Sequence, residues 1–173
     1  MESALFQLMA NAAVALGLLF IYAGFQKFVH PETFRGTLSL VPYLPMAAIP
    51  VVAQLVPIVE IIAGGGLVAG ARWGSAFTAA LLLATSMVAA VAVSKKQAIP
   101  CVCFSSAGTE VLSVSTLLRN AFLAAIALFP CLAESGSVDV PTFVGGIAVL
   151  FLYLGVDAAS KNLKFMRQVN EWS

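Results

Sequence analysis

The stretch WGSAFTAALLLATSMVAAVAV, from Trp73 to Val93, contains no charged residue and is followed closely by Lys95 and Lys96. A helix of about 20 mostly apolar residues crosses the roughly 30 Å hydrocarbon core of a bilayer. The stretch therefore predicts a membrane-spanning helix. The whole chain has the same character, because 61% of its 173 residues are hydrophobic and only 10% are charged. Soluble domains have about 25% charged residues, so we expect an integral membrane protein.

Four further stretches are long and apolar enough to span a membrane. Together with the first one, the predicted spans are 5–25, 47–69, 73–93, 111–132 and 140–159. Helices are expected because these runs lack the alternating polar positions of a membrane β-barrel. The N-terminal run follows Met1-Glu2-Ser3 without the basic region of a secretory signal, so we expect it to remain as a span. We predict an all-α polytopic bundle of four to five transmembrane helices, forming a single domain over residues 1–173.

The link between the first two spans is longer than a tight turn and predicts a short interfacial or re-entrant helix. Pro31 suits a first helical turn, and Glu32 suits the positive end of a helix dipole. The apolar side chains that we expect to point into the membrane interface are Phe34, Leu38 and Val41.

Basic residues are distributed unequally between the two sides of the predicted bundle. The side with the N-terminus has Arg72 alone. The basic residues of the other side are Lys27, Arg35, Lys95, Lys96, Lys161, Lys164 and Arg167. Cytoplasmic loops carry the excess of Lys and Arg, so we expect the N-terminus outside and the C-terminus in the cytoplasm. No basic block is interleaved with aromatic residues, and no nucleic-acid partner is expected.

Small residues recur at Gly66, Gly70 and Gly74, at a spacing that permits close helix approach. We favour packing between the second and third spans over a dimer contact.

Cys101 and Cys103 are separated by one residue and follow Pro100. Two thiols at this spacing can form a small, strained disulfide ring, which is easily reduced. Buried free cysteines also act as small apolar residues. The spacing alone leaves both interpretations open.

Cys131 is expected at the other end of the fourth span from this pair, about 30 Å away along a helix. Since a disulfide needs Cα atoms within roughly 7 Å, direct pairing is disfavoured. Only His30 and Cys131 could complete a metal ligand set with the pair, and neither is near in sequence, so no metal site is expected. His30 itself is expected to be solvated.

Ionisable residues at membrane depth usually pair or line a pathway. Glu60 and Arg119 are the predicted buried charge pair, joining the second and fourth spans. The pair could serve to fix the helix register, or it could act in proton or substrate transfer, and both interpretations remain open. Asp157 and Lys161 are four residues apart and are expected to satisfy each other on one helix face.

Four segments together resemble one known family. These are FIYAGFQKF (20–28) continuing into HPETF (30–34), PIVEIIAG (57–64), CVCF (101–104) and STLLRNA (115–121). They are similar to the first two spans, the cysteine loop and the fourth span of the methylamine utilisation MauE family, within the wider MauE/DoxX-like set of redox-associated membrane proteins. The resemblance covers most of the chain from Phe20 to about Leu132. Many members read Cys-Gly-Cys-Phe-Gly where this chain reads Cys-Val-Cys-Phe-Ser, which changes the turn around the thiols.

The resemblance implies a place in the bacterial cytoplasmic membrane and a role in maturing methylamine dehydrogenase. The small subunit of that enzyme carries many disulfides and a tryptophan-derived quinone, and would be the indirect client. The family's usual companion is a thioredoxin-like protein, MauD, which is thought to act on the periplasmic side. By this analogy, Cys101 and Cys103 exchange thiols or electrons with that partner.

The charge count, however, places the cysteine loop on the cytoplasmic side, whereas the implied client folds outside. The loop could fold into the membrane, the protein could relay cytoplasmic reducing equivalents outward as DsbD/CcdA conduits do, or one predicted span could be wrong. We favour the relay.

Three functions follow from these observations. The leading one is a thiol–disulfide redox protein, either an oxidoreductase or an electron conduit. The alternatives are a non-catalytic assembly factor or anchor for the partner, and a small transporter that uses Glu60 and Arg119. A quinone-linked oxidase resembling DsbB is a further alternative, but no local motif identifies a quinone site, so no cofactor is assigned.

Overall fold

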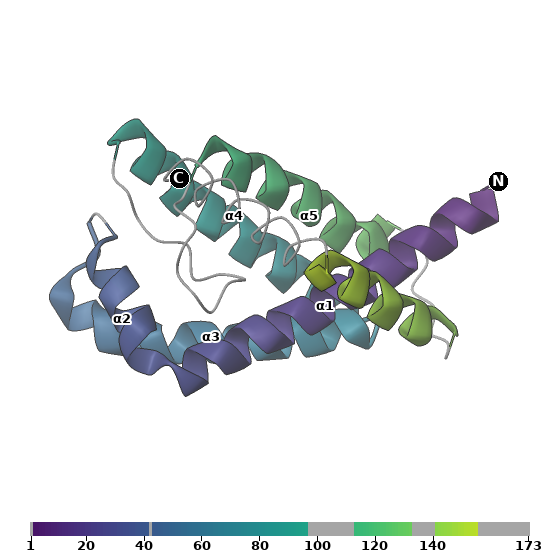
Figure 1. Ribbon diagram of the computed structural model, residues 1–173, viewed down its shortest axis with the longest axis horizontal. Helices are drawn as coiled ribbons and strands as arrows, with labels where there is room; N and C mark the ends of the chain where they lie inside the picture. The colour runs from purple at the N-terminus through teal and green to yellow at the C-terminus, as the bar shows by residue number, and fades with distance from the viewer. Residues whose placement is uncertain (1, 42, 97–112, 133–140, 156–173) are drawn as a thin grey trace, which may run out of the picture.

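The computed structural model describes residues 2–41, 43–96, 113–132 and 141–155, and every regular element in these ranges is a helix (Figure 1). The elements are α1 (Glu2–Val29), α2 (Pro31–Ser39), the 3-10 turn η1 (Met46–Ala48), α3 (Ile49–Val68), α4 (Arg72–Ser94), α5 (Val114–Leu132) and an apolar helix at Pro141–Gly155. The prediction of an all-α helix bundle is confirmed.

Three of these helices are long and apolar enough to cross a membrane, namely Gln7–Val29, Met46–Val68 and Arg72–Ser94. Val114–Phe129 and Pro141–Gly155 are shorter apolar helices. Large apolar side chains such as Phe122 and Met87 point outward, at 66% and 69% exposure, where lipid can cover them. The chain is a multi-pass membrane protein. Each of the five apolar segments predicted from the sequence overlaps one of the apolar helices, while the division into five spans stays a prediction.

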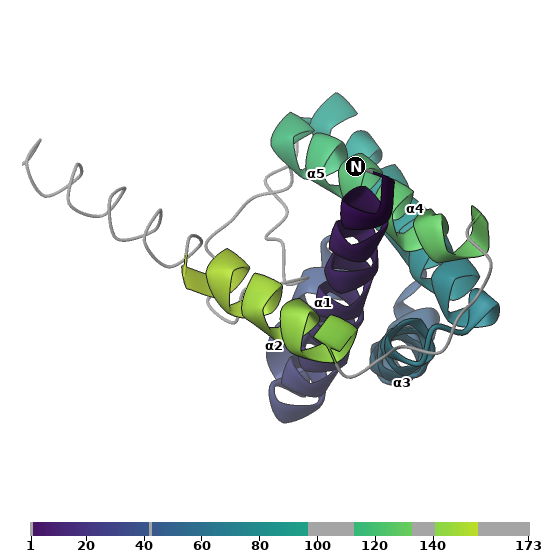
Figure 2. The ribbon, with the colours of Figure 1, turned by 90° about the vertical axis from the view of Figure 1, so that its right-hand side faces the viewer.

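The helices form two tightly packed pairs. α1 packs along α3, and α4 packs along α5 in the antiparallel sense (Figure 1). The short turn between α3 and α4 joins the pairs. α1 also contacts α5, and the 141–155 helix lies on the other side of α1 from α3 (Figure 2). There the Gln7 Nε2 atom donates a hydrogen bond to the Thr142 hydroxyl at 3.1 Å.

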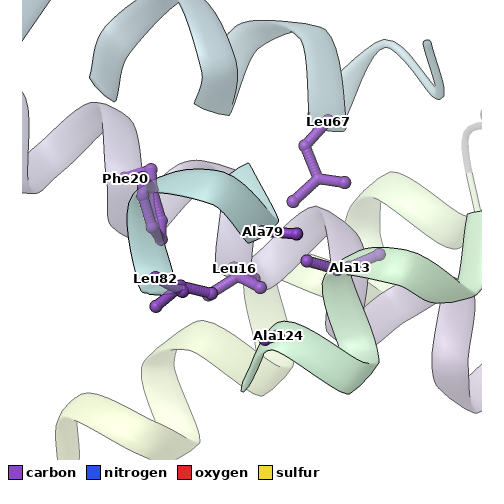
Figure 3. Close-up of a cluster of buried hydrophobic side chains, with 8 residues drawn as sticks. Ala13, Leu16, Phe20, Leu67, Ala79, Leu82 and Ala124 are labelled. Atoms are coloured by element: carbon purple, nitrogen blue, oxygen red, sulfur yellow. The ribbon is translucent and has the colours of Figure 1, made fainter. Parts of the chain in front are cut away.

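The hydrophobic core lies where the two pairs meet (Figure 3). It draws residues from α1, α3, α4 and α5, and its members are Ala13, Leu16, Phe20, Leu67, Ala79, Leu82, Ala124 and Ala127. Half of them are alanines, so helix backbones approach closely with little side-chain volume between them.

Glycines permit the closest helix contacts. A Cβ atom added to Gly17 would lie 2.8 Å from the Gly64 carbonyl oxygen, so the α1–α3 pair depends on both glycines. At the α3–α4 turn, Gly66 and Gly74 are in backbone contact, and Gly70 has a φ of 70° that favours glycine. The predicted packing between the second and third spans is therefore confirmed for Gly66 and Gly74, with Gly70 serving the turn. Gly17 and Gly64 were not predicted as contact residues from the sequence.

Helix α2 begins at Pro31 as the sequence predicts, with Glu32 in its first turn. The predicted orientation of its apolar side chains is wrong for two of them. Phe34 and Leu38 are buried, at 7% and 9% exposure, and α2 contacts α3 and α1. The apolar face of α2 thus packs against protein. Its exposed face carries Glu32 and Arg35, whose side chains form a salt bridge at 3.3 Å.

Candidate functional site

A buried ion pair joins α1 to α3. The ammonium nitrogen of Lys27 lies 2.8 Å from Oε1 and 2.7 Å from Oε2 of Glu60, and donates hydrogen bonds to both. The two side chains are only 2% and 9% exposed. Charges at membrane depth are costly unless they are paired, and this pair neutralises both groups.

The helix contact beside the pair explains how the two charges meet. Gly24 lies three residues before Lys27, and Pro57 lies three residues before Glu60, so each pair of residues shares one helix face. A Cβ atom on Gly24 would lie 2.8 Å from the Pro57 carbonyl oxygen and 3.3 Å from the Glu60 Cβ atom. The absence of a side chain at Gly24 thus lets α1 approach α3 closely enough for a direct ion pair.

Helix α2 covers the pair from one side. The Lys27 ammonium lies 5.5 Å from the centroid of the Phe34 ring, in cation–π contact. Such contacts contribute more when the cation is desolvated. Phe34 therefore connects α2 to the Lys27 ammonium, the same buried charge that joins α1 to α3.

Glu60 also lines a small cavity. The remaining lining residues come from α1, α4 and α5, and they are Phe20, Ala23, Leu81, Leu82, Thr85 and Asn120. Asn120 is buried at 3% exposure, and its Nδ2 atom donates a hydrogen bond to the Thr85 hydroxyl at 3.2 Å. Polar side chains from α3, α4 and α5 thus meet at this cavity, and α1 contributes apolar lining.

The sequence predicted that Glu60 pairs with Arg119, but the structure pairs Glu60 with Lys27. Both oxygens of Glu60 accept hydrogen bonds from Lys27, a residue expected in a loop because it follows the first apolar run. Continuing α1 to Val29 brings Lys27 inside the bundle. Arg119 is half-buried on α5, next to Asn120. The residues that sequence reasoning missed here are Lys27, Thr85 and Asn120, and no local sequence pattern points to any of them.

Cys101 and Cys103 lie outside the described residues, in the link between α4 and α5. Both ends of that link are described. At Lys95, the ammonium donates a hydrogen bond to the Tyr43 hydroxyl at 2.6 Å, which ties the end of α4 to the segment before α3. At Ser113, the backbone N–H donates to the Thr116 hydroxyl at 3.3 Å, at the start of α5.

The structure describes only some of the other residues singled out from the sequence. The backbone of Cys131 lies near the end of α5, about 26 Å along the helix from Val114 at 1.5 Å per residue. His30 is exposed and precedes α2. Asp157 and Lys161 are outside the described residues. Among the residues that are described, no group of three His, Cys, Asp or Glu side chains could hold a metal ion.

Two comparisons with known proteins identify the same family. Residues 5–133 match the family described as methylamine utilisation protein MauE. The methylamine utilization protein MauE of Paracoccus denitrificans is 35% identical over 150 residues, covering 82% of this chain and 81% of that protein. No solved structure matches. The matched range includes the Lys27–Glu60 pair, Asn120 and both cysteines of the α4–α5 link, and the chain belongs to the MauE family of methylamine utilisation proteins.

Proposed function

We propose that this protein is a membrane thiol–disulfide redox protein that supports maturation of the methylamine dehydrogenase small subunit, together with a thioredoxin-like partner of the MauD type. One observation carries the proposal: the Cys101-x-Cys103 pair lies within the family-matched range, between two antiparallel helices of a membrane bundle. Membership of a family named for methylamine utilisation supports the choice of client.

The chemistry is thiol–disulfide exchange at the cysteine pair. The thiolate of one cysteine attacks a disulfide sulfur of the partner, forming a mixed disulfide and releasing one partner thiolate. The second cysteine, as its thiolate, then attacks the mixed disulfide. This step forms the Cys101–Cys103 disulfide and releases the second partner thiolate. The partner gains two electrons and this protein loses two; the reverse sequence oxidises the partner.

The orientation proposed for this reaction has the cysteine link on the cytoplasmic side of the bacterial inner membrane. In Figure 1 the end of α4, the end of α1 and α2 lie at the same end of the bundle. Exposed basic side chains of Arg35 and Lys95 belong to that end, while Arg72 begins α4 at the other end. Excess positive charge marks the cytoplasmic side. Relay of cytoplasmic reducing equivalents outward would then connect the pair to a periplasmic client.

Genetic complementation tests the proposal. A strain lacking this protein receives the wild-type chain, the Cys101→Ser/Cys103→Ser double variant or a Cys131→Ser control, with membrane levels of each checked by immunoblot. We expect the double variant to lose assembled methylamine dehydrogenase and growth on methylamine, and the Cys131→Ser variant to retain both. Normal maturation with the double variant would refute the redox mechanism and leave the non-catalytic assembly factor in its place.

A further inference from the structure

The cavity beside Glu60 lies at the boundary between the two helix pairs. Glu60 belongs to the α1–α3 pair, whereas Thr85 and Asn120 belong to the α4–α5 pair. The hydrogen bonds described for these groups stay within each pair. Lys27 donates to Glu60 inside the first, and Asn120 donates to Thr85 inside the second.

The polar groups around the cavity retain unused hydrogen-bonding capacity. A carboxylate has about four lone-pair sites, and the Lys27 ammonium takes one on each oxygen of Glu60. A primary amide has two N–H donors, and the bond to Thr85 takes one of those of Asn120. The Thr85 hydroxyl itself donates to the Leu82 carbonyl oxygen at 3.0 Å. The cavity therefore has the Glu60 carboxylate as an acceptor on one wall. On the other wall it has the Asn120 amide, which offers a free N–H donor and a carbonyl acceptor.

The cavity lining combines four apolar side chains with the polar side chains of Glu60, Thr85 and Asn120. Empty cavities in proteins are apolar, whereas polar ones hold water when two to four partners are in reach. Leaving the free lone pairs of a buried carboxylate against a void would add a desolvation penalty. The cavity has room for about one water molecule.

We propose that this cavity is a binding site for one small hydrogen-bond donor, a water molecule, which bridges Glu60 on α3 to Asn120 and Thr85 across the boundary between the helix pairs. The bridge turns two separate contacts into one network from Lys27 to Asn120. It links α1 and α3 to α4 and α5. This role is independent of the cysteine chemistry proposed above.

Water-edited solid-state NMR of the protein in lipid bilayers tests the site, with water protons as the probe and ¹³C-labelled glutamate as the reporter. The Glu60→Gln variant assigns the Glu60 carboxylate signal. We expect rapid magnetisation transfer from water to that carboxylate in the wild type. We expect its loss in Asn120→Leu, which removes the amide and fills the cavity, and its weakening in Thr85→Val, which keeps the side-chain shape.

Ser86 supplies a matched control. Its hydroxyl donates to the same Leu82 carbonyl oxygen, at 2.7 Å, but Ser86 does not line the cavity. Ser86→Ala should leave the transfer unchanged. Absence of transfer in the wild type would show that the cavity is empty. Equal transfer in the wild type, Asn120→Leu and Thr85→Val would show that water reaches Glu60 by another route, and either result overturns the proposal. Thr85→Val keeps the measurement decisive if Asn120→Leu fails to fold.

Discussion

Lys27 and Glu60 are 33 residues apart in the chain, yet the Lys27 ammonium contacts both carboxylate oxygens of Glu60 inside the bundle. The pair connects the end of α1 to the middle of α3, and Phe34 of α2 lies against the same ammonium. One buried contact thereby fixes the relative positions of three helices.

Breaking this pair on one side should destabilise the bundle. Lys27→Met leaves a buried carboxylate without its partner, and Glu60→Met leaves a buried ammonium. Removing one member of a buried pair costs about 3–5 kcal/mol. The Lys27→Met/Glu60→Met double variant should recover most of this loss, because both buried charges are gone. Thermal unfolding in nanodiscs measures the differences in stability.

The surface pair Arg35–Glu32 is the control for this experiment, since the Glu32 side chain is 83% exposed. Exposed salt bridges contribute about 0–1 kcal/mol, so Glu32→Gln should change stability little. Single variants at Lys27 and Glu60 that behave like Glu32→Gln would show that the pair does not stabilise the fold.

The location of this pair shows where sequence reasoning succeeds and where it stops. The uncharged runs predict helices because a bilayer requires hydrogen-bonded backbone groups in every span. The structure has a helix in each of these runs. The need of Glu60 for a partner was also evident from the sequence. The identity of the partner was not, because Lys27 follows an apolar run and has the appearance of a loop residue. Its burial depends on Gly24 meeting Pro57, a contact between two helices that no local pattern encodes.

The orientation of α2 shows the same limit. Its start follows from Pro31 and Glu32, which act locally. Whether Phe34 faces lipid or protein depends on the surface that α1 and α3 offer, which is a tertiary property. The cysteine pair is different again: its chemistry is visible in the spacing of Cys101 and Cys103, and its redox role remains a proposal.

Close packing of α1 against α3 should be sensitive to a single methyl group. A Cβ atom on Gly64 would lie 2.5 Å from the Gly17 carbonyl oxygen, so Gly64→Ala forces the helices apart. Overpacking of this kind costs about 1–3 kcal/mol. Gly65 is the neighbouring control, because a Cβ atom there meets nothing within 4 Å. Gly65→Ala should be neutral or slightly stabilising, since alanine favours helix by about 1 kcal/mol over glycine.

Unfolding temperatures of the two alanine variants, in the same detergent, give this comparison directly. Equal stability of Gly64→Ala and Gly65→Ala would contradict the α1–α3 contact described here.

Removal of the Phe34 side chain should release α2 from the bundle. Phe34→Ala deletes a buried ring and its contact with Lys27, and such core truncations cost about 3–5 kcal/mol. Hydrogen–deuterium exchange should then rise along 31–39 more than in α4. Leu40 is 51% exposed, so Leu40→Ala is the control and should leave exchange in α2 near the wild-type rate. If α2 instead rests on lipid through Phe34, the exchange should depend on the bilayer and not on the protein contact.

The redox proposal is tested most directly by the accessibility of Cys101 and Cys103 to a membrane-impermeant maleimide. Labelling is compared in intact cells and inverted vesicles, before and after mild reduction, with single-cysteine variants to assign each site. We expect reduction to unmask both thiols in inverted vesicles, as a disulfide open to the cytoplasm requires. Full labelling of both thiols before reduction, combined with normal dehydrogenase maturation in the double-serine variant, would contradict a redox-active pair.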